Sequence, residues 1–394
     1  MIMAKTKKIE LLAPVGNFKC LVAAIKAGAD AVYFGLKEFN MRDSARNFTI
    51  KDLKKINEMC KKAKIKKYLT LNTIIYNNEL SRLEVIFKQI KGKVDAIICW
   101  DHSVIELCKK YKVPFHVSTQ ASVANSQAAR FYKKLGAKRI VLARELDLEQ
   151  IKKISKIIPT EVFIHGAMCV SVSGRCFTSQ FLFGKSANRG KCMHPCRRSY
   201  RVIDEEGNEL KLENSRVMSA KDLCTLPFIE KLKQSGISSF KIEGRVREPE
   251  YVYTVTKVYR QALDKKLDKK ELEKALEDLK KVYNREFSSG FYLKLPTADD
   301  FTKSESGAAS EKKKVIGKIL GYWDKIGVAH VKLYANKTLK VGDEIIVSGN
   351  TTFFKTQIQD IEVNHKKVKE TKEECGIKLP KCRKNDEIYL VIKK

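Results

Sequence analysis

The first 245 residues alternate short apolar runs with stretches of helical period. The apolar runs are nearly continuous in hydrophobicity and rich in β-branched or aromatic residues, which is typical of parallel strands that are covered on both faces. The eight runs are 8–16, 30–36, 68–75, 95–100, 115–122, 139–146, 161–168 and 239–245. The stretches of helical period between them are 17–28, 51–64, 79–91, 101–111, 125–135 and 147–157. This alternation predicts an α/β fold, a (β/α)8 TIM-like barrel. A doubly wound open sheet is the alternative, which the lack of a Gly-rich phosphate fingerprint after the first strand disfavours.

A long insertion, residues 169–238, separates the seventh and eighth predicted strands. It contains a cysteine-rich loop (169–200), a hairpin-like piece (200–219) and a segment that we expect to be helical (221–236). Two further helices are predicted after the eighth strand, over 248–266 and 269–286.

The chain changes character near its C-terminal end. Residues 296–313 are polar and small, as linkers are. Residues 314–394 form short alternating runs between Gly-Asp and Asn turns, which predicts a small antiparallel β-barrel. We therefore expect a barrel domain over 1–295, a linker over 296–313 and a β-barrel domain over 314–394.

The charge balance is strongly basic, since 78 Lys and Arg stand against 46 Asp and Glu, a formal net charge of +32. A lysine-rich, solvated surface would explain part of this excess. An excess of this size also attracts phosphate backbones and binds them by counterion release, so we expect an RNA or DNA partner. No run reaches the roughly 18–20 apolar residues that span a bilayer, and the basic N-terminus lacks an apolar signal region. We therefore expect a cytoplasmic protein with no membrane partner.

Four of the eleven cysteines lie close together, in the pattern Cys169-x6-Cys176-x15-Cys192-x3-Cys196. Their flanking residues are Gly, Ser, Asn and Arg, so chance clustering of core thiols is a poor explanation. Structural zinc sites favour pairs two to four residues apart, and only the second pair meets that spacing. An iron–sulfur cluster tolerates wider spacing and is the preferred interpretation, with zinc as the alternative metal. The thiols of Cys20, Cys60, Cys99 and Cys108 are expected to be isolated and buried. Cys375 and Cys382, in a Lys-rich hairpin, are expected to be two lone thiols, with a redox or metal role as the alternative.

Basic residues accompany these cysteines. Positive charge would stabilise a thiolate-bound cluster of net negative charge and would also contact RNA phosphate. The candidate RNA-binding residues are Arg175, Arg189, Arg197 and Arg198.

Polar residues end several predicted strands, where the side chains of a barrel face the active site. Buried without partners, each would cost about 1–3 kcal/mol, so as a set they indicate a site. We assign acid–base roles to Glu145, His165 and Glu243. We assign substrate binding to Arg46, Asn72, Gln120, Arg144, Lys241 and Arg245, with Arg144 and Arg245 suited to clamp carboxylates of a small anion.

Several ordered motifs make the chain resemble the U32 family, which was first named for collagenase-like peptidases. They include "ELLAPVGNFKCLVAAIKAGADAVYFG", "SARNFT", "STQAS", "EVFIHGAMCVSVSGRCFTSQF", "RGKCMHPCRRSY", "MSAKDLC" and "FKIEGRVREPEYV". The resemblance covers roughly residues 9–290, and the C-terminal part resembles the domain-two barrel of translation factors. Glu161, Gly166 and Gly174 also match the family signature.

The resemblance implies RNA hydroxylation, at C5 of a tRNA wobble uridine or of a cytidine in 23S ribosomal RNA. It implies a 4Fe–4S cluster on Cys169, Cys176, Cys192 and Cys196, with Cys224 as a reserve ligand. It further implies prephenate as the hydroxyl source, and an electron-donor protein would be a further partner.

Two alternatives stay open from the sequence. A U32 peptidase could use Cys169 and His165 as nucleophile and base, although no "GxSxG" or "HExxH" motif is present. The third hypothesis is a basic RNA-binding protein with a structural zinc.

Overall fold

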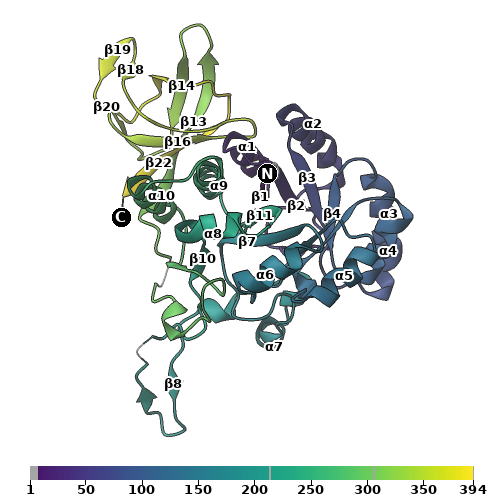
Figure 1. Cartoon of the computed structure of the whole chain (residues 1–394). Coiled ribbons are helices and arrows are strands. Elements are labelled where there is room, and N and C mark those ends of the chain that lie inside the picture. The colour runs from purple at the N-terminus through teal and green to yellow at the C-terminus, as the bar shows by residue number, and fades with distance from the viewer. Residues whose placement is uncertain (1–7, 213, 305–306, 394) are drawn as a thin grey trace.

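The computed structural model describes residues 8–212, 214–304 and 307–393, and in these residues eight parallel strands form a closed ring (Figure 1). Each strand pairs with the next, and β11 pairs with both β1 and β7. The strands are β1 (Glu10–Pro14), β2 (Ala31–Gly35), β3 (Lys66–Thr70), β4 (Ala96–Cys99), β5 (Phe115–Val117), β6 (Arg139–Val141), β7 (Thr160–Gly166) and β11 (Ser239–Ile242). All eight overlap the predicted runs. The closing pairs confirm the barrel and contradict the open sheet.

Helices cover the outside of the ring (Figure 1). They are α1 (Phe18–Lys26), α2 (Leu53–Ala63), α3 (Leu80–Ile90), α4 (His102–Lys110), α5 (Ser126–Lys134), α6 (Leu148–Ser155), α8 (Ile229–Lys233), α9 (Pro249–Asp264) and α10 (Lys269–Lys281). Side chains at several N-termini bond the free amides of the first turn. Asn17 accepts from the Cys20 amide, and Asn125 accepts from the Ala128 amide. The apolar faces of these helices pack on the strands in one large core.

The prediction of a helix over residues 221–236 is wrong for the first half of that segment. Asp222–Cys224 form a strand, β10, which runs antiparallel to β7 and also pairs with β12 (Phe287–Ser288). Only Ile229–Lys233 become the helix α8. The pairing of β10 with β7 places Cys224 opposite His165. The insertion is therefore hydrogen-bonded to the end of β7 before the chain enters β11.

Two small elements lie within the insertion. The helix α7 (Thr178–Phe183) belongs to the cysteine-rich loop. The predicted hairpin is present as β8 (Val202–Ile203) paired with β9 (Glu209–Leu210), and it projects away from the barrel (Figure 1).

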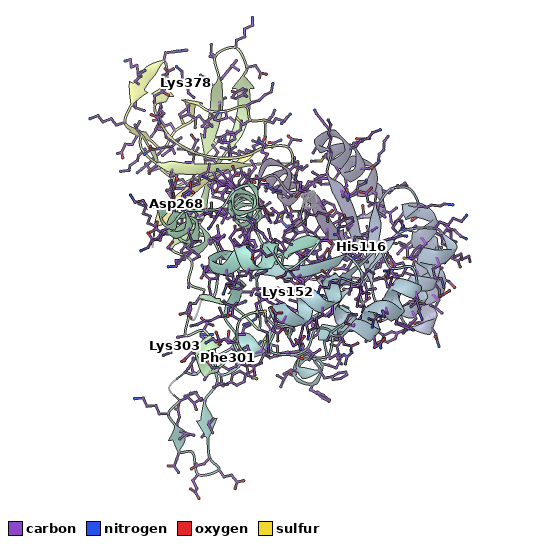
Figure 2. The ribbon with its side chains drawn as sticks, in the orientation of Figure 1. His116, Lys152, Asp268, Phe301, Lys303 and Lys378 are labelled. Carbon is purple, nitrogen blue, oxygen red and sulfur yellow. The ribbon has the colours of Figure 1, made fainter. Side chains whose placement is uncertain are left out.

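The C-terminal part is antiparallel, as predicted. Its strands are β13 (Glu311–Trp323), β14 (Val328–Leu333), β15 (Leu339–Lys340), β16 (Glu344–Ser348), β17 (Phe353–Gln357), β18 (Ile361–Val363), β19 (Lys366–Val368), β20 (Glu370–Thr371), β21 (Cys375–Lys378) and β22 (Glu387–Lys393). Eight of these described strands form one sheet, in the order β17-β16-β22-β13-β14-β21-β18-β19, around a separate core. The side chains of the sheet are drawn around Lys378 in Figure 2.

The C-terminal sheet packs on α1 and α9 (Figure 1). The rings of Tyr253 and Phe353 lie 4.9 Å apart, and Lys26 Nζ donates to the Phe353 carbonyl at 3.1 Å. Within the predicted linker, Phe301 forms a bridge with Ala220, and residues 305 and 306 lie outside the described residues. The domain limits stay a prediction. Among the described residues, no helix combines the length and apolar character needed to cross a bilayer.

Candidate functional site

The cysteine-rich loop leaves the barrel at the carboxyl end of β7, where the active sites of such barrels lie. The chain turns at Gly166, whose φ is +105°. A Cβ at this position would stand 2.7 Å from the Glu243 carbonyl oxygen. Only glycine therefore fits the turn that directs the loop over the mouth of the barrel. A Cβ on Gly174 would stand 2.9 Å from Gln120 Cγ, so the loop also lies directly on the end of β5.

The four predicted cysteine ligands lie near one another. Burial raises the pKa of Cys196, Arg197 lowers it, and the charges of Cys169, Cys192 and Cys176 raise it again. Cys169 is exposed and the other three are half-buried. The fold therefore brings the four thiols into one electrostatic neighbourhood, although 27 positions separate the first from the last.

The donor set fits an iron–sulfur cluster in kind and number. A four-iron cluster takes one Cys thiolate on each iron, so its ligands do not converge on a single point. Residues 162–203 contain seven Lys and Arg and no Asp or Glu, a composition suited to an anionic cluster. In the described parts of the chain, no three His, Cys, Asp or Glu side chains converge as a site for one metal ion. The cluster on these four cysteines stays a prediction.

An ion pair between a half-buried arginine and a buried glutamate lies at the mouth of the barrel. Arg42, in the loop after β2, donates from Nη2 to Glu243 Oε1 at 2.9 Å and from Nε at 3.3 Å. Burial alone would raise the pKa of Glu243, but Arg42 and Arg247 hold it below its ordinary value. The charge of Cys169 acts on Arg42. Glu243 is therefore an ionised carboxylate that holds a guanidinium beside the thiol loop.

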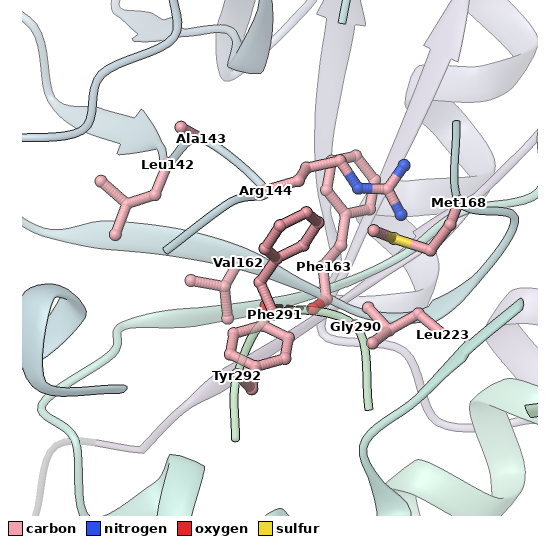
Figure 3. Close-up of a pocket in the computed structure, with 10 residues that line it drawn as sticks. All are labelled: Leu142, Ala143, Arg144, Val162, Phe163, Met168, Leu223, Gly290, Phe291 and Tyr292. Atoms are coloured by element: carbon pink, nitrogen blue, oxygen red, sulfur yellow. Dashed lines mark hydrogen bonds between the residues drawn. The ribbon is translucent and has the colours of Figure 1, made fainter. Parts of the chain in front are cut away.

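Arg144 occupies a pocket between the ends of β6 and β7 (Figure 3). Its guanidinium lies 4.7 Å from the centroid of the Phe163 ring, and Nη2 donates to the Ala167 carbonyl at 3.0 Å. Its buried Nε has no hydrogen-bond partner. Burial lowers the pKa of Arg144, while Glu243 and Cys169 favour its charged form. An unused donor on a buried cation can bind the oxygen of an anionic ligand.

The other predicted substrate-binding residues of the mouth are engaged in protein contacts. Arg245 donates from Nη1 to Thr70 Oγ1 and from Nη2 to Asn40 Oδ1, each at 2.9 Å. Burial lowers the pKa of Arg245 to about 10. Asn72 and Gln120 are buried neighbours, with Asn72 Nδ2 donating to Gln120 Oε1 at 3.5 Å. These residues shape the floor under the loop.

The three predicted acid–base residues are in different environments. His165 is only 1% exposed, and burial lowers its pKa to about 3, so its imidazole is neutral. Its Nδ1 lies 3.4 Å from the Tyr259 hydroxyl, which lies 3.7 Å from Cys224 Sγ. Glu145 is exposed. Of the three, only Glu243 joins the charged groups beside the thiol loop.

Lys241 lies inside the barrel. Its Nζ donates to Glu161 Oε1 at 2.8 Å, and Glu161 is fully buried. Arg139 Nη1 bonds the other oxygen of Glu161 at 3.1 Å and also bonds Glu10. Burial alone would raise the pKa of Glu161, but Lys241 and Arg139 lower it. Lys241 is thus part of an interior ionic network, and its assigned role in substrate binding stays a prediction.

The basic residues predicted to bind RNA divide into two groups. Arg175 and Arg198 are exposed, and the Arg198 guanidinium lies 4.7 Å from the Phe183 ring centroid. Arg189 instead pairs with Glu79, and Arg197 Nη1 donates to the Ala220 carbonyl at 2.6 Å. The second group anchors the loop to the barrel.

One predicted residue lies apart from the others, and two arginines that act on Glu243 were not predicted. Arg46 is exposed, and its charge acts on Glu387 of the C-terminal sheet. Sequence reasoning chose Arg46 and missed Arg42 in the same loop. Arg247, which lies 3.7 Å from the Tyr283 ring centroid, was missed as well. Both missed arginines follow strand ends, which is the signal that could have found them.

Cys20, Cys60, Cys99 and Cys108 are buried, as expected, and Cys375 and Cys382 are buried as well. Cys224, the reserve ligand, is 3% exposed, and burial raises its pKa to about 11. Its Sγ lies 3.7 Å from the Tyr259 hydroxyl.

Comparison with known proteins finds a match between residues 16–302 and the model of peptidase family U32. An uncharacterized protease of Methanocaldococcus jannaschii is 40% identical over 403 residues, covering 97% of this chain and 98% of the relative. A collagenase of Porphyromonas gingivalis is 39% identical, covering 96% of this chain and 97% of the relative. The tRNA hydroxylation protein P1 of Bacillus subtilis is 36% identical, covering 86% and 83%.

Proposed function

The chain belongs to peptidase family U32, and from this premise we propose that it hydroxylates a pyrimidine of RNA at C5. The observation that carries the proposal is the loop after β7, which groups four thiols in a segment without a single carboxylate. A peptidase has no need for such a loop, whereas an enzyme that performs redox chemistry on a polyanion needs both features. The relative named as a tRNA hydroxylation protein supports this choice.

Cys169, Cys176, Cys192 and Cys196 hold a 4Fe–4S cluster in this proposal. When bound, the cluster supplies electron transfer or activation of the substrate. Arg42 and Arg197 lie where the charge of Cys169 acts on them, so they stabilise the anionic loop.

Replacing the C5 hydrogen of a pyrimidine by a hydroxyl group oxidises the base by two electrons, so the reaction needs a source of the hydroxyl group and an acceptor of two electrons. One donor can be both, if it gives its hydroxyl group to C5, takes up the C5 hydrogen in exchange and is thereby reduced by two electrons. We propose a small carboxylate such as prephenate in this role. Arg144 is the residue suited to hold it, because its Nε is buried and unpaired beside the thiol loop. Glu243 keeps Arg42 in place at the mouth and, as an ionised carboxylate, can accept a proton there.

The peptidase alternative depends on a nucleophile and a base that contact each other. His165 is buried and neutral, and its Nδ1 contacts the Tyr259 hydroxyl. Cys169 is exposed on the loop. Within the described residues, no hydrogen bond joins His165 to Cys169. Because relatives are named as a collagenase and a protease, peptidase activity is one outcome that the test must distinguish.

The test is mass spectrometry of nucleosides from tRNA and ribosomal RNA of a strain that lacks the gene. We expect one 5-hydroxypyrimidine to disappear, to return with the wild-type gene and to stay absent with Cys169→Ser. Phe131→Ala, an exposed change on α5, is the matched control and should restore the nucleoside. A deletion strain that keeps every hydroxylated pyrimidine would overturn the proposal and put collagen-peptide cleavage assays first.

A further inference from the structure

A patch of exposed apolar side chains lies on the outer side of the thiol loop. Phe181 is 86% exposed, Phe177 62% and Leu182 58%. The two phenyl rings are 6.5 Å apart, with 60° between their planes. We call these three residues the α7 platform. Apolar side chains that gather on a surface, rather than lying scattered singly, mark an interaction site.

The loop fixes the α7 platform from below. Ser179 is buried, and its Oγ accepts from the Met193 amide at 3.0 Å and lies 3.9 Å from Cys192 Sγ. The helix ends at Gly184, whose φ is +63°. The inner face of α7 is thus tied to the thiol loop by polar contacts, and this leaves the rings turned outward. Figure 1 shows α7 at the edge of the molecule, away from the C-terminal sheet.

The surroundings of the platform are basic. Lys185, Lys191 and Arg198 are exposed near it in the chain, and the Arg198 guanidinium covers the Phe183 ring. No Asp or Glu occurs anywhere in residues 162–203. The ligand that matches is one that carries negative charge and flat apolar faces together. Single-stranded nucleic acid has both, because its bases are free to stack on aromatic side chains while its phosphates meet Lys and Arg.

We propose that the α7 platform stacks an unpaired base of the RNA substrate, next to the base that reacts. This inference rests on the proposed function and adds the surface that selects unpaired RNA. Phe177 directly follows Cys176, so a base on the platform lies beside the thiol loop. A duplex keeps its bases stacked on one another and cannot use the platform without opening.

The experiment measures the binding of two labelled RNAs to the purified full chain by fluorescence anisotropy. One is a hairpin with an unpaired pyrimidine-rich loop, and the other is a duplex of equal length. Phe181→Ala and Phe177→Ala should each weaken hairpin binding about 5- to 150-fold, since one stacked base contributes about 1–3 kcal/mol. Phe181→Trp should bind like the wild type. Duplex binding should change less than twofold.

Salt dependence separates stacking from charge. Phe181→Ala removes no charge, so the slope of log K against log salt should stay as in the wild type. Lys185→Ala should reduce that slope by about 1. Phe131→Ala is the matched control, because Phe131 is 54% exposed on α5, far from the thiol loop in the chain. Unchanged melting temperatures would show that the variants remain folded.

Three outcomes would overturn the inference. Phe181→Ala and Phe177→Ala could bind the hairpin as tightly as the wild type, which would show that no base of the RNA stacks on the platform. They could weaken hairpin and duplex equally, which would remove selection of unpaired bases. The wild type could bind neither RNA. The first two outcomes leave RNA hydroxylation intact, whereas the deletion strain described above tests hydroxylation without any reference to the platform.

Discussion

Arg42 Nη2 and Glu243 Oε1 lie 2.9 Å apart and connect the loop after β2 to the end of β11 across β1. Glu243 is 6% exposed, so its charge depends on this partner. Burial lowers the pKa of Arg42, but Glu243 raises it above its ordinary value, with a smaller contribution from Cys169. The pair therefore connects two strand ends at the mouth of the barrel.

The Arg42–Glu243 pair predicts a pH-dependent stability. The pKa of Glu243 is lower in the folded chain than the unfolded value of about 4.3, so its stabilisation is complete above that value and is lost as pH falls through the folded pKa. Arg42→Ala should lower the free energy of unfolding at pH 7 by about 1–3 kcal/mol. The difference from the wild type should shrink as the pH falls from 5 to 3, measured by urea denaturation. Arg130→Ala, on exposed α5, is the control. A difference independent of pH would contradict the account.

Glu161 predicts the largest loss of stability, because it is fully buried between Arg139 and Lys241. Glu161→Ala leaves two buried cations without this partner and should lower the free energy of unfolding by about 3–5 kcal/mol. Glu161→Gln keeps the size of the side chain and serves if the alanine variant does not fold. Glu149→Ala removes an exposed pair with Lys152 and should cost at most about 1 kcal/mol. Similar urea midpoints for Glu161→Ala and Glu149→Ala would refute the interior network.

We expect a steric effect from a side chain at Gly166, and a substitution at Gly92 serves as the control. Gly166→Ala places a Cβ 2.7 Å from the Glu243 carbonyl oxygen and strains a positive φ. Gly92 also has a positive φ, +72°, but a Cβ there meets no atom within 4 Å. Gly92→Ala should cost about 1–2 kcal/mol from backbone strain alone, and Gly166→Ala should cost more than that. Equal losses in thermal or urea unfolding would show that the turn at β7 is not crowded.

If Arg144 binds the hydroxyl donor, its substitution should change how the reaction rate depends on the donor concentration. Arg144→Gln removes the charge in the pocket of Figure 3, so the donor concentration for half-maximal product should rise about 10- to 100-fold, equivalent to roughly 1.5–3 kcal/mol for a charged hydrogen bond. The maximal rate should change much less. Hydroxylated nucleoside formed against prephenate concentration gives both values. Arg130→Gln is the control. If Arg144→Gln lowered the maximal rate and left the half-saturating donor concentration unchanged, a binding role for Arg144 would be excluded.

The barrel could be predicted from the sequence because each strand is a short apolar run covered on both faces. The helix predicted over 221–236 failed at Asp222–Cys224, where pairing with β7 outweighs local propensity. The four cysteines were chosen as candidate ligands from the composition of the segment around them and from the family resemblance. The polar residues were harder, because the sequence does not show which charges meet. Lys241 faces Glu161 and Arg189 faces Glu79 only once the ring has closed.

The central claim is that the loop after β7 holds a four-iron cluster. The most direct measurement is iron and acid-labile sulfide per chain, with a visible spectrum, after anaerobic purification. We expect about four of each and a broad absorbance that reduction bleaches. Cys169→Ser should lose both, whereas Cys224→Ala should keep them, because Cys224 is buried against Tyr259. Colourless protein that carries one zinc, or no metal after anaerobic reconstitution, would contradict the account.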